Sequence, residues 1–197
     1  PTMRSGGALE PPQFTVLDTL VNLETSVTVS DDFDRGKDIN YRMHPANAGC
    51  LNAAHIDACA LANNHVMDFG HNGLLETLEV LHRAGIATAG AGRDLDEARR
   101  PARVPLGDGA SLLMFAFGLE TSGIPAGWAA GASRPGVHLI DDLSSAQADD
   151  ILDRVRAVKR DGDVAVASVH WGSNWGFELD RGQVPFAHHL IDGGIDL

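Results

Sequence analysis

Short apolar runs alternate with amphipathic segments along the chain from Ile56 onward. A strand with one solvent-exposed face alternates apolar and polar residues. The runs at 56–62 and 111–118 lack this alternation, so they are typical of strands buried on both faces. Between such runs, leucines recur at helical spacing, as at Leu74, Leu78 and Leu81. This alternation predicts stacked β-α units and therefore an α/β fold.

The boundaries of the predicted elements follow from their flanking residues. A helix over 73–84 should end at Gly85, because glycine adopts the left-handed conformation that closes helices at little cost. Asp94 and Ser144 each precede a Glu or Gln by three residues, the capping-box spacing that opens a helix. Strands are expected at 20–23, 56–62, 86–92, 111–118 and 163–170, and further helices at 47–54 and 183–191.

The length of 197 residues fits a single α/β domain over 1–197. Residues 195–197 are expected to begin another strand, directly after Gly193-Gly194. A β-α series that stops at the first residues of a strand favours an interior fragment, truncated at both ends.

Charge and hydropathy exclude some classes of function. The chain has 27 acidic and 15 basic residues, a net charge of −12, which argues against a nucleic-acid partner. No stretch approaches the roughly 18 uninterrupted apolar residues of a membrane span. No signal-peptide segment is visible, but a leader would lie outside this chain, so the cell envelope and the cytoplasm both remain open.

Polar side chains follow three of the predicted strands at the ends where ligands gather in open α/β sheets. Glu24 follows the strand at 20–23, Asn64 and His65 follow the strand at 56–62, and His170 ends the strand at 163–170. Carboxylate, amide oxygen and imidazole together suit Mn, Fe, Zn or Mg. Each residue also has an ordinary interpretation: a solvated turn residue, a hydrogen-bonded loop and a half-buried histidine.

Two basic residues in the polar segment before the first helix are candidates for substrate binding. Lys37 and Arg42 carry charges that bind carboxylate or phosphate, and Arg forms bidentate pairs with both. The alternative is that both are surface residues of a loop.

A longer pattern identifies a family. The block LANNHVMDFG at 61–70 is followed, in order, by Gly73-Leu74, Thr77-Leu78, Leu81, Gly85-Ile86, Gly90-Ala91-Gly92, Glu97-Ala98 and Pro101. It is flanked by NLET at 22–25 and VHWG at 169–172, and the helix at 183–191 also fits. From about residue 20 to residue 197 the chain resembles the CapA/PgsA family of poly-γ-glutamate capsule biosynthesis proteins.

The resemblance implies a four-layer α/β sandwich of the metallo-dependent phosphatase type, and a two-metal site in the intact protein. It also implies that Glu24, Asn64 and His170 are metal ligands. His65 would be the acid or hydrogen-bond donor aimed at a substrate oxygen. Asp68 would orient His65, although a plain Asx-turn explains Asp68 equally well.

Two parts of the family pattern have no counterpart here. The family is expected to have an Asp-containing strand, in a Gly-Asp setting, before this chain begins, and residues 1–14 do not supply it. It also has a Gly-His motif on the strand that begins at Ile195, where the chain stops. Without these ligands, the remaining residues are expected to hold metal poorly, and only one ion.

Two functions from different classes follow from the resemblance. The first is a metal-dependent hydrolase of phosphoester or amide bonds, with an anionic polymer or a small phosphorylated substrate. The second is a non-catalytic binding or assembly subunit for synthesis or export of an anionic polymer, working with other capsule-synthesis proteins. A nucleophilic α/β hydrolase is disfavoured, because the chain has no G-x-S-x-G elbow.

Overall fold

The computed structural model describes residues 18–197 except 174 and 177, and in this part of the chain two three-stranded sheets carry the fold. The first sheet is parallel, in the order β1-β4-β5. The second has the order β10-β8-β7, with β10 parallel and β7 antiparallel to β8. Their strands are β1 (Thr19–Asn22), β4 (Ile56–Ala60), β5 (Ala87–Ala89), β7 (Ala102–Gly107), β8 (Ala110–Gly118) and β10 (Val164–His170).

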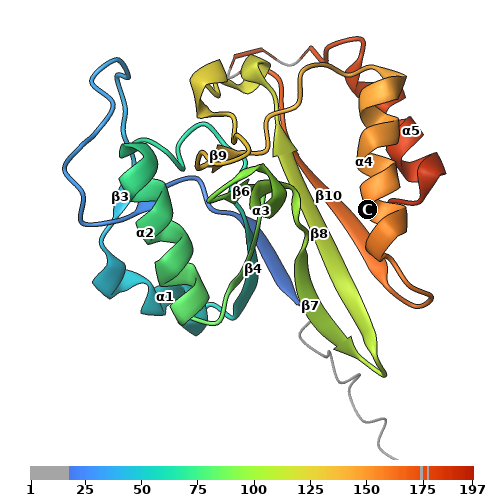
Figure 1. The fold of residues 1–197 in the computed structure, drawn as a ribbon, viewed down its shortest axis with the longest axis horizontal. Coiled ribbons are helices and arrows are strands. Elements are labelled where there is room, and N and C mark those ends of the chain that lie inside the picture. Colours follow the sequence, from blue (N-terminus) through green and yellow to red (C-terminus); the bar gives the residue numbers. More distant parts are fainter. Residues whose placement is uncertain (1–17, 174, 177) are drawn as a thin grey trace, which may run out of the picture.

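Helix α2 (Gly70–Arg83) covers the outer face of the first sheet (Figure 1). Its apolar stripe, including Leu74, Leu78 and Leu81, packs on Cys59 of β4. Because side chains alternate along a strand, the neighbours of Cys59 point to the other face of the sheet. The strand is therefore buried on both faces, as its continuous apolar run predicts.

Helices α4 (Ser145–Val158) and α5 (Gln183–Gly193) cover the outer face of the second sheet. Phe115 and Phe117 of β8 pack there against Leu152 of α4 and Phe186 of α5. The hydroxyl of Ser144 accepts a hydrogen bond from the backbone of Gln147 at 3.2 Å, which confirms the predicted cap of α4.

The two sheets lie between α2 on one side and α4 and α5 on the other (Figure 1). Their inner faces meet across a layer of mostly small side chains. Because alanine carries only a methyl group, the two sheets approach each other closely in this layer. This interface between the sheets, here called the alanine layer, consists of Ala58, Ala60, Ala62, Ala89, Ala102, Val104, Met114 and Ala116. It places the carboxyl ends of β4 and β8 next to each other.

The remaining elements are short and lie around the two sheets. Two pairs of two-residue strands, β2 with β3 and β6 with β9, form small separate sheets. None of the helices in the described part of the chain is long and apolar enough to cross a membrane. The short elements are β2 (Ser26–Val27), β3 (Arg42–Met43), η1 (Pro45–Asn47), α1 (Gly49–Ala53), β6 (Ala91–Gly92), α3 (Leu95–Arg99), η2 (Glu120–Ser122), η3 (Ala126–Trp128) and β9 (Gly136–Val137).

The predicted α/β fold is confirmed, with three local differences. The expected strand at 86–92 is two strands, β5 and β6, because Gly90 between them has a φ of +89°. The expected helix at 47–54 is the short pair η1 and α1. Residues 195–197 are not assigned as a strand, but the backbone of Ala167 donates to the carbonyl of Leu197 at 2.9 Å, alongside β10. The prediction about residues 1–14 lies outside the described residues.

Candidate functional site

Three polar side chains from three strand ends converge at one edge of the molecule. The Nε2 atom of His170, at the end of β10, lies 3.2 Å from Oδ1 of Asn64, in the turn after β4. The same Nε2 atom lies 3.9 Å from Oε1 of Glu24, which follows β1. Glu24, Asn64 and His170 therefore lie together, at the strand ends where the sequence analysis places them.

The strand registers explain why these residues meet. His170 is paired with Gly118 of β8, and Asn22 of β1 is paired with Ala60 of β4, so the ends of neighbouring strands coincide. Gly118 allows the two sheets to close at this edge. A Cβ atom on Gly118 would lie 3.0 Å from the carbonyl oxygen of Ala62 and 3.3 Å from that of His170.

The protonation state of His170 follows from its surroundings. Its side chain is 24% exposed, and that of Glu24 is 40% exposed. Burial lowers the pKa of His170 below the ordinary value of 6.5; the carboxylate of Glu24 raises it, and His65 lowers it. Burial is the largest of these effects, so the imidazole of His170 is neutral at neutral pH. A neutral imidazole is the form that binds metal ions.

Asn63 holds the turn after β4 against the end of β1, a role that the sequence analysis did not assign to it. Its Oδ1 atom accepts hydrogen bonds from the backbone of His65 at 3.1 Å and of Val66 at 2.9 Å. Its Nδ2 atom donates to Oδ1 of Asn22 at 2.9 Å and to the carbonyl of Leu23 at 3.0 Å. Asn63 is fully buried, and its bond to the backbone of Val66 is buried with it, whereas the other three are partly buried. The only sequence signal for this role is the turn-forming Asn-Asn pair.

The same chain of hydrogen bonds continues to Glu24. The amide of Asn22, which accepts from Asn63, donates to Oε2 of Glu24 at 3.1 Å. The carboxylate of Glu24 is thereby linked to the turn that carries Asn64. The geometry of the three converging side chains is thus set partly by two asparagines that are not among them.

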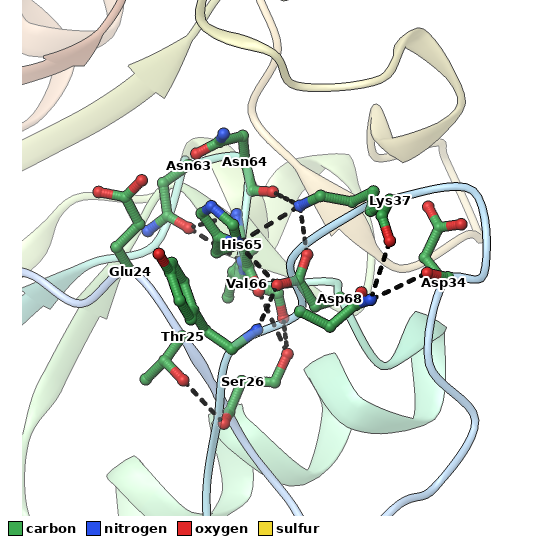
Figure 2. A network of polar contacts seen from close by, with 12 residues as sticks. Glu24, Thr25, Ser26, Asp34, Lys37, Asn63, Asn64, His65, Val66 and Asp68 are labelled. Carbon is green, nitrogen blue, oxygen red and sulfur yellow. Dashed lines mark hydrogen bonds and ion pairs between the residues drawn. The ribbon is translucent and has the colours of Figure 1, made fainter. Parts of the chain in front are cut away.

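A second cluster surrounds the buried carboxylate of Asp68 (Figure 2). Its Oδ2 atom lies 2.7 Å from Nδ1 of His65 and accepts a hydrogen bond from the backbone of Tyr41 at 2.7 Å. Its Oδ1 atom pairs with the ammonium of Lys37. The ring of Tyr41 packs on the ring of His65, with centroids 4.2 Å apart. Asp68 therefore joins the loop before β3 to the turn after β4.

These contacts indicate which ring nitrogen of His65 carries the proton. Because the Oδ2 atom of Asp68 can only accept when the carboxylate is ionised, Nδ1 of His65 carries the proton in that pair. The Nε2 atom of His65 is then the nitrogen available to other groups. Of the two predictions for Asp68, the contact with His65 is present, and the carboxylate reaches the distant Tyr41 backbone rather than closing an Asx-turn.

The two predicted substrate-binding residues differ in position. Lys37 lies at the site, where its ammonium contacts Asp68 and the carbonyl of Asn64 and lies 5.2 Å from the centre of the Trp128 ring. Arg42 instead makes 2.7 Å contacts with Asp31 and the carbonyl of Ser30. None of these contacts of Arg42 involves the three converging side chains.

The donor set at the strand ends is small. Within residues 18–197, leaving aside 174 and 177, no three His, Cys, Asp or Glu side chains gather closely enough to hold a metal ion. Only Glu24 and His170 of the converging residues are of these types, and the third donor is the amide of Asn64.

The fold and the converging strand ends define an α/β protein with a polar site at the carboxyl ends of its strands. Residues 18–197 match the family described as bacterial capsule synthesis protein PGA_cap, and the chain belongs to that family. The resemblance found in the sequence is therefore confirmed.

The chain is also similar to curated proteins of the same kind. It is 47% identical over 194 residues to a probable polyglutamine synthesis accessory protein of Mycobacterium tuberculosis, covering 98% of this chain and 51% of that protein. It is 25% identical over 177 residues to the PGA biosynthesis protein CapA of Bacillus subtilis, covering 89% of this chain and 44% of that protein. The chain thus spans about half the length of the relatives that it matches.

Proposed function

We propose that the protein acts in the synthesis of a poly-γ-glutamate capsule, as a metal-dependent hydrolase of phosphoester or amide bonds. Its substrate would be an anionic polymer or a small phosphorylated compound. Family membership and the names of the relatives support the capsule role. The convergence of Asn64, His170 and Glu24 is the observation that supports a metal site.

The packing of the sheets supports the finer assignment of the fold. One helix lies outside the first sheet, two helices lie outside the second, and the alanine layer lies between the sheets. We infer that this is the four-layer sandwich of the metallo-dependent phosphatase type. In that fold, strand ends of both sheets contribute to one site, as β4 and β10 do here.

The distances between the donor atoms fit a shared cation. Two ligands that each lie about 2.1 Å from one ion lie about 3.0–3.4 Å from each other, depending on the coordination angle. The 3.2 Å between His170 and Asn64 falls in this range, and the 3.9 Å to Glu24 is within reach of a rotation of its exposed carboxylate. Mn, Fe, Zn or Mg would bind here, and a bound ion would act as a Lewis acid on a substrate oxygen or a water.

The His65–Asp68 pair would transfer a proton to or from a substrate oxygen. Asp68 fixes the imidazole of His65 through Nδ1, and the ring of Tyr41 restricts its rotation. The Nε2 atom is then oriented to contact a substrate oxygen, as acceptor when the ring is neutral and as donor when it is protonated. Lys37 pairs with the other oxygen of Asp68 and holds the carboxylate in place.

The second candidate is a non-catalytic subunit that binds an anionic polymer during its synthesis or export. One observation favours it: within the described part of the chain, only two of the converging side chains are ligands of the His, Cys, Asp or Glu type. A site with so few charged ligands binds metal weakly. The polar residues at the strand ends would then bind substrate without hydrolysing it.

Metal content and turnover separate the two candidates. The purified protein is dialysed against Mn²⁺ or Zn²⁺, its bound metal is counted by mass spectrometry, and hydrolysis of p-nitrophenyl phosphate is followed. The hydrolase proposal expects bound metal and turnover in the protein and in His82→Ala, whose histidine is exposed on α2, and neither in His170→Ala. Absence of metal from the unmodified protein would leave the binding subunit as the better candidate.

A further inference from the structure

A basic hollow lies between α3 and α4, at the other edge of the second sheet from His170. It has a volume of about 300 Å³, and its lining includes Arg99, Arg100 and Arg154. Pro101, also in the lining, comes directly before β7. Because β7 and β10 are the two edge strands of this sheet, the hollow is separate from the strand-end site formed by Glu24, Asn64 and His170. We call it the arginine hollow.

The arginine hollow has a positive lining in a chain whose net charge is −12. Arg154 is paired with Asp150 at 3.2 Å, whereas neither Arg99 nor Arg100 forms an ion pair within the described residues. Asp96 is the one carboxylate among the described lining residues. The chain as a whole repels anions, so an anion that binds here is held by these arginines.

A buried atom of Arg99 points to a ligand independently of the charges. Its Nε atom is buried and has no hydrogen-bond partner within the described part of the chain. The Nε2 atom of His138, a side chain only 4% exposed, is a second such atom. The two residues are neighbours, because Arg99 has the largest effect of any charged side chain on the pKa of His138, which it lowers. Buried polar atoms are nearly always paired, and a guanidinium can only donate, so this N–H of Arg99 is available to an acceptor on a ligand.

A further arginine extends the basic surface beyond the hollow. Arg103 of β7 is paired with Leu113 of β8, so both side chains lie on the face of the sheet that α4 covers. The Nη2 atom of Arg103 donates to the carbonyl of Val158, which lines the hollow, at 3.5 Å. Its Nη1 atom lies 3.7 Å from Asp163. The basic groups therefore continue along the protein surface, which suits an extended anion better than a single small one.

The apolar part of the lining indicates which kind of anion fits. Pro101, Ala157 and Val158 have no side-chain donors for the remaining oxygens of a phosphate. Methylene groups of an organic anion can pack on them. A γ-linked glutamate chain has both features, because methylene groups separate its free carboxylates. Guanidinium groups form bidentate pairs with carboxylates.

We propose that the arginine hollow binds carboxylates of a γ-linked glutamate chain, at a place apart from the strand-end site. Arg99 and Arg100 bind the carboxylates, and the methylene groups between them pack on the apolar lining. The identity of the polymer rests on the proposed capsule role, whereas the hollow itself requires neither metal nor hydrolysis. It would hold one part of the polymer while another part is free to reach the strand ends.

Calorimetric titration with a γ-linked glutamate oligomer tests the proposal, with EDTA present so that metal plays no part. The oligomer is expected to bind, and to bind more weakly as salt is added. The same oligomer with its carboxylates converted to amides is expected to give no heat of binding. Pyrophosphate is expected to bind more weakly than the oligomer. Tighter binding of pyrophosphate would overturn the assignment to a carboxylate chain.

Matched charge variants locate the site. Arg99→Gln with Arg100→Gln is expected to lower the affinity for the oligomer roughly tenfold. The control, Arg83→Gln with Arg156→Gln, removes the same charge from exposed positions on α2 and α4 and should change the affinity less than about twofold. Arg100→Gln alone, at an exposed residue, keeps the test valid if Arg99→Gln lowers the melting temperature, and should cost roughly threefold. Equal losses in the two double variants would overturn the proposal.

The strand-end variant separates this inference from the proposed function. His170→Ala is expected to bind the oligomer as tightly as the unmodified protein does. Loss of binding in His170→Ala, with normal binding in the arginine variants, would overturn the proposal and place the polymer at the strand ends. A protein that binds the oligomer through Arg99 and Arg100 but does not hydrolyse p-nitrophenyl phosphate would contradict the hydrolase proposal alone. Turnover without oligomer binding would contradict the arginine hollow alone.

Discussion

His170 and Asn64 are 106 residues apart in the sequence, yet the Nε2 atom of one lies 3.2 Å from the Oδ1 atom of the other. The contact joins the two sheets at their carboxyl ends, because His170 ends β10 and Asn64 follows β4. His65, the next residue, belongs to a different set of contacts, centred on Asp68. The structure therefore assigns different consequences to substitutions at these two histidines.

We expect His170→Ala to lose bound metal and His65→Ala to keep it. The imidazole of His170 is a direct donor in the converging set, whereas Nδ1 of His65 is engaged by Asp68. If His65 transfers a proton, its loss should lower turnover by roughly 10²–10⁴-fold at unchanged metal content. Metal analysis and a phosphatase assay on both variants check this. Equal loss of metal from both would make His65 a ligand.

Asn63→Ala should destabilise the fold by about 2–4 kcal/mol. The substitution leaves the buried backbone N–H of Val66 and the partly buried N–H of His65 without an acceptor, and each such group costs about 1–3 kcal/mol. Asn52→Ala is the matched control, because Asn52 is exposed and makes one side-chain bond, to the carbonyl of Ala84. The free energy of unfolding of the control, measured in urea, should change by less than about 1 kcal/mol. Similar losses in the two variants would contradict the structural role given to Asn63.

Lys37→Met distinguishes a substrate-binding lysine from one that stabilises Asp68. Asp68 is fully buried, so removal of Lys37 leaves its carboxylate with fewer partners, at a cost of about 2–4 kcal/mol. Arg83→Met removes an exposed partner of Glu79 and should cost less than about 0.5 kcal/mol. Thermal unfolding measures the stability loss of each variant. A Lys37 variant of unchanged stability with a raised KM would instead favour direct binding of substrate.

His138 should make stability fall as the pH is lowered from about 6.5 to about 4. Burial, with a smaller effect of Arg99, lowers the pKa of His138 from 6.5 to about 4. Between these values the unfolded chain binds a proton that the folded chain does not, so folding weakens by up to about 3 kcal/mol and the effect levels off below pH 4. The pH dependence of urea unfolding, compared between His138→Leu and the exposed-site control His82→Gln, tests this. An equally steep loss in His138→Leu would assign the effect to other groups.

Gly118→Ala should disturb the site from a distance. The added methyl group would lie 2.3 Å from Cδ1 of Ile124 and 3.0 Å from the carbonyl oxygen of Ala62, so the ends of β4 and β8 must separate. Such overpacking costs about 1–3 kcal/mol. Metal affinity should fall as well, because Asn64 and His170 stand on the two sides of this contact. Gly49→Ala, where the methyl group meets nothing within 4 Å, should leave both quantities nearly unchanged.

The sequence predicted most of the fold because the main strands are continuous apolar runs and because capping residues mark the starts of α3 and α4. It also predicted that Glu24, Asn64 and His170 meet, since strand ends in α/β sheets share an edge. It could not predict the bonds of Asn63 or the pairing of Lys37 with Asp68. The bonds of Asn63 depend on how the turn after β4 lies against the end of β1. The pairing of Lys37 depends on the path of the loop before β3, and neither has a periodic pattern. The interruption at Gly90 was missed for a related reason, because a single φ angle leaves no periodic signal.

The alanine layer has a consequence for how the family can vary. Its members are not among the three converging side chains, yet any of them that gained a larger side chain would push the sheets apart and move Asn64 away from His170. Tolerance to substitution should therefore not increase steadily with distance from Glu24, Asn64 and His170. A saturation mutagenesis screen should find positions such as Ala60 and Ala116 nearly as intolerant of bulky residues as the strand ends themselves, while exposed positions on α2 accept almost any polar residue.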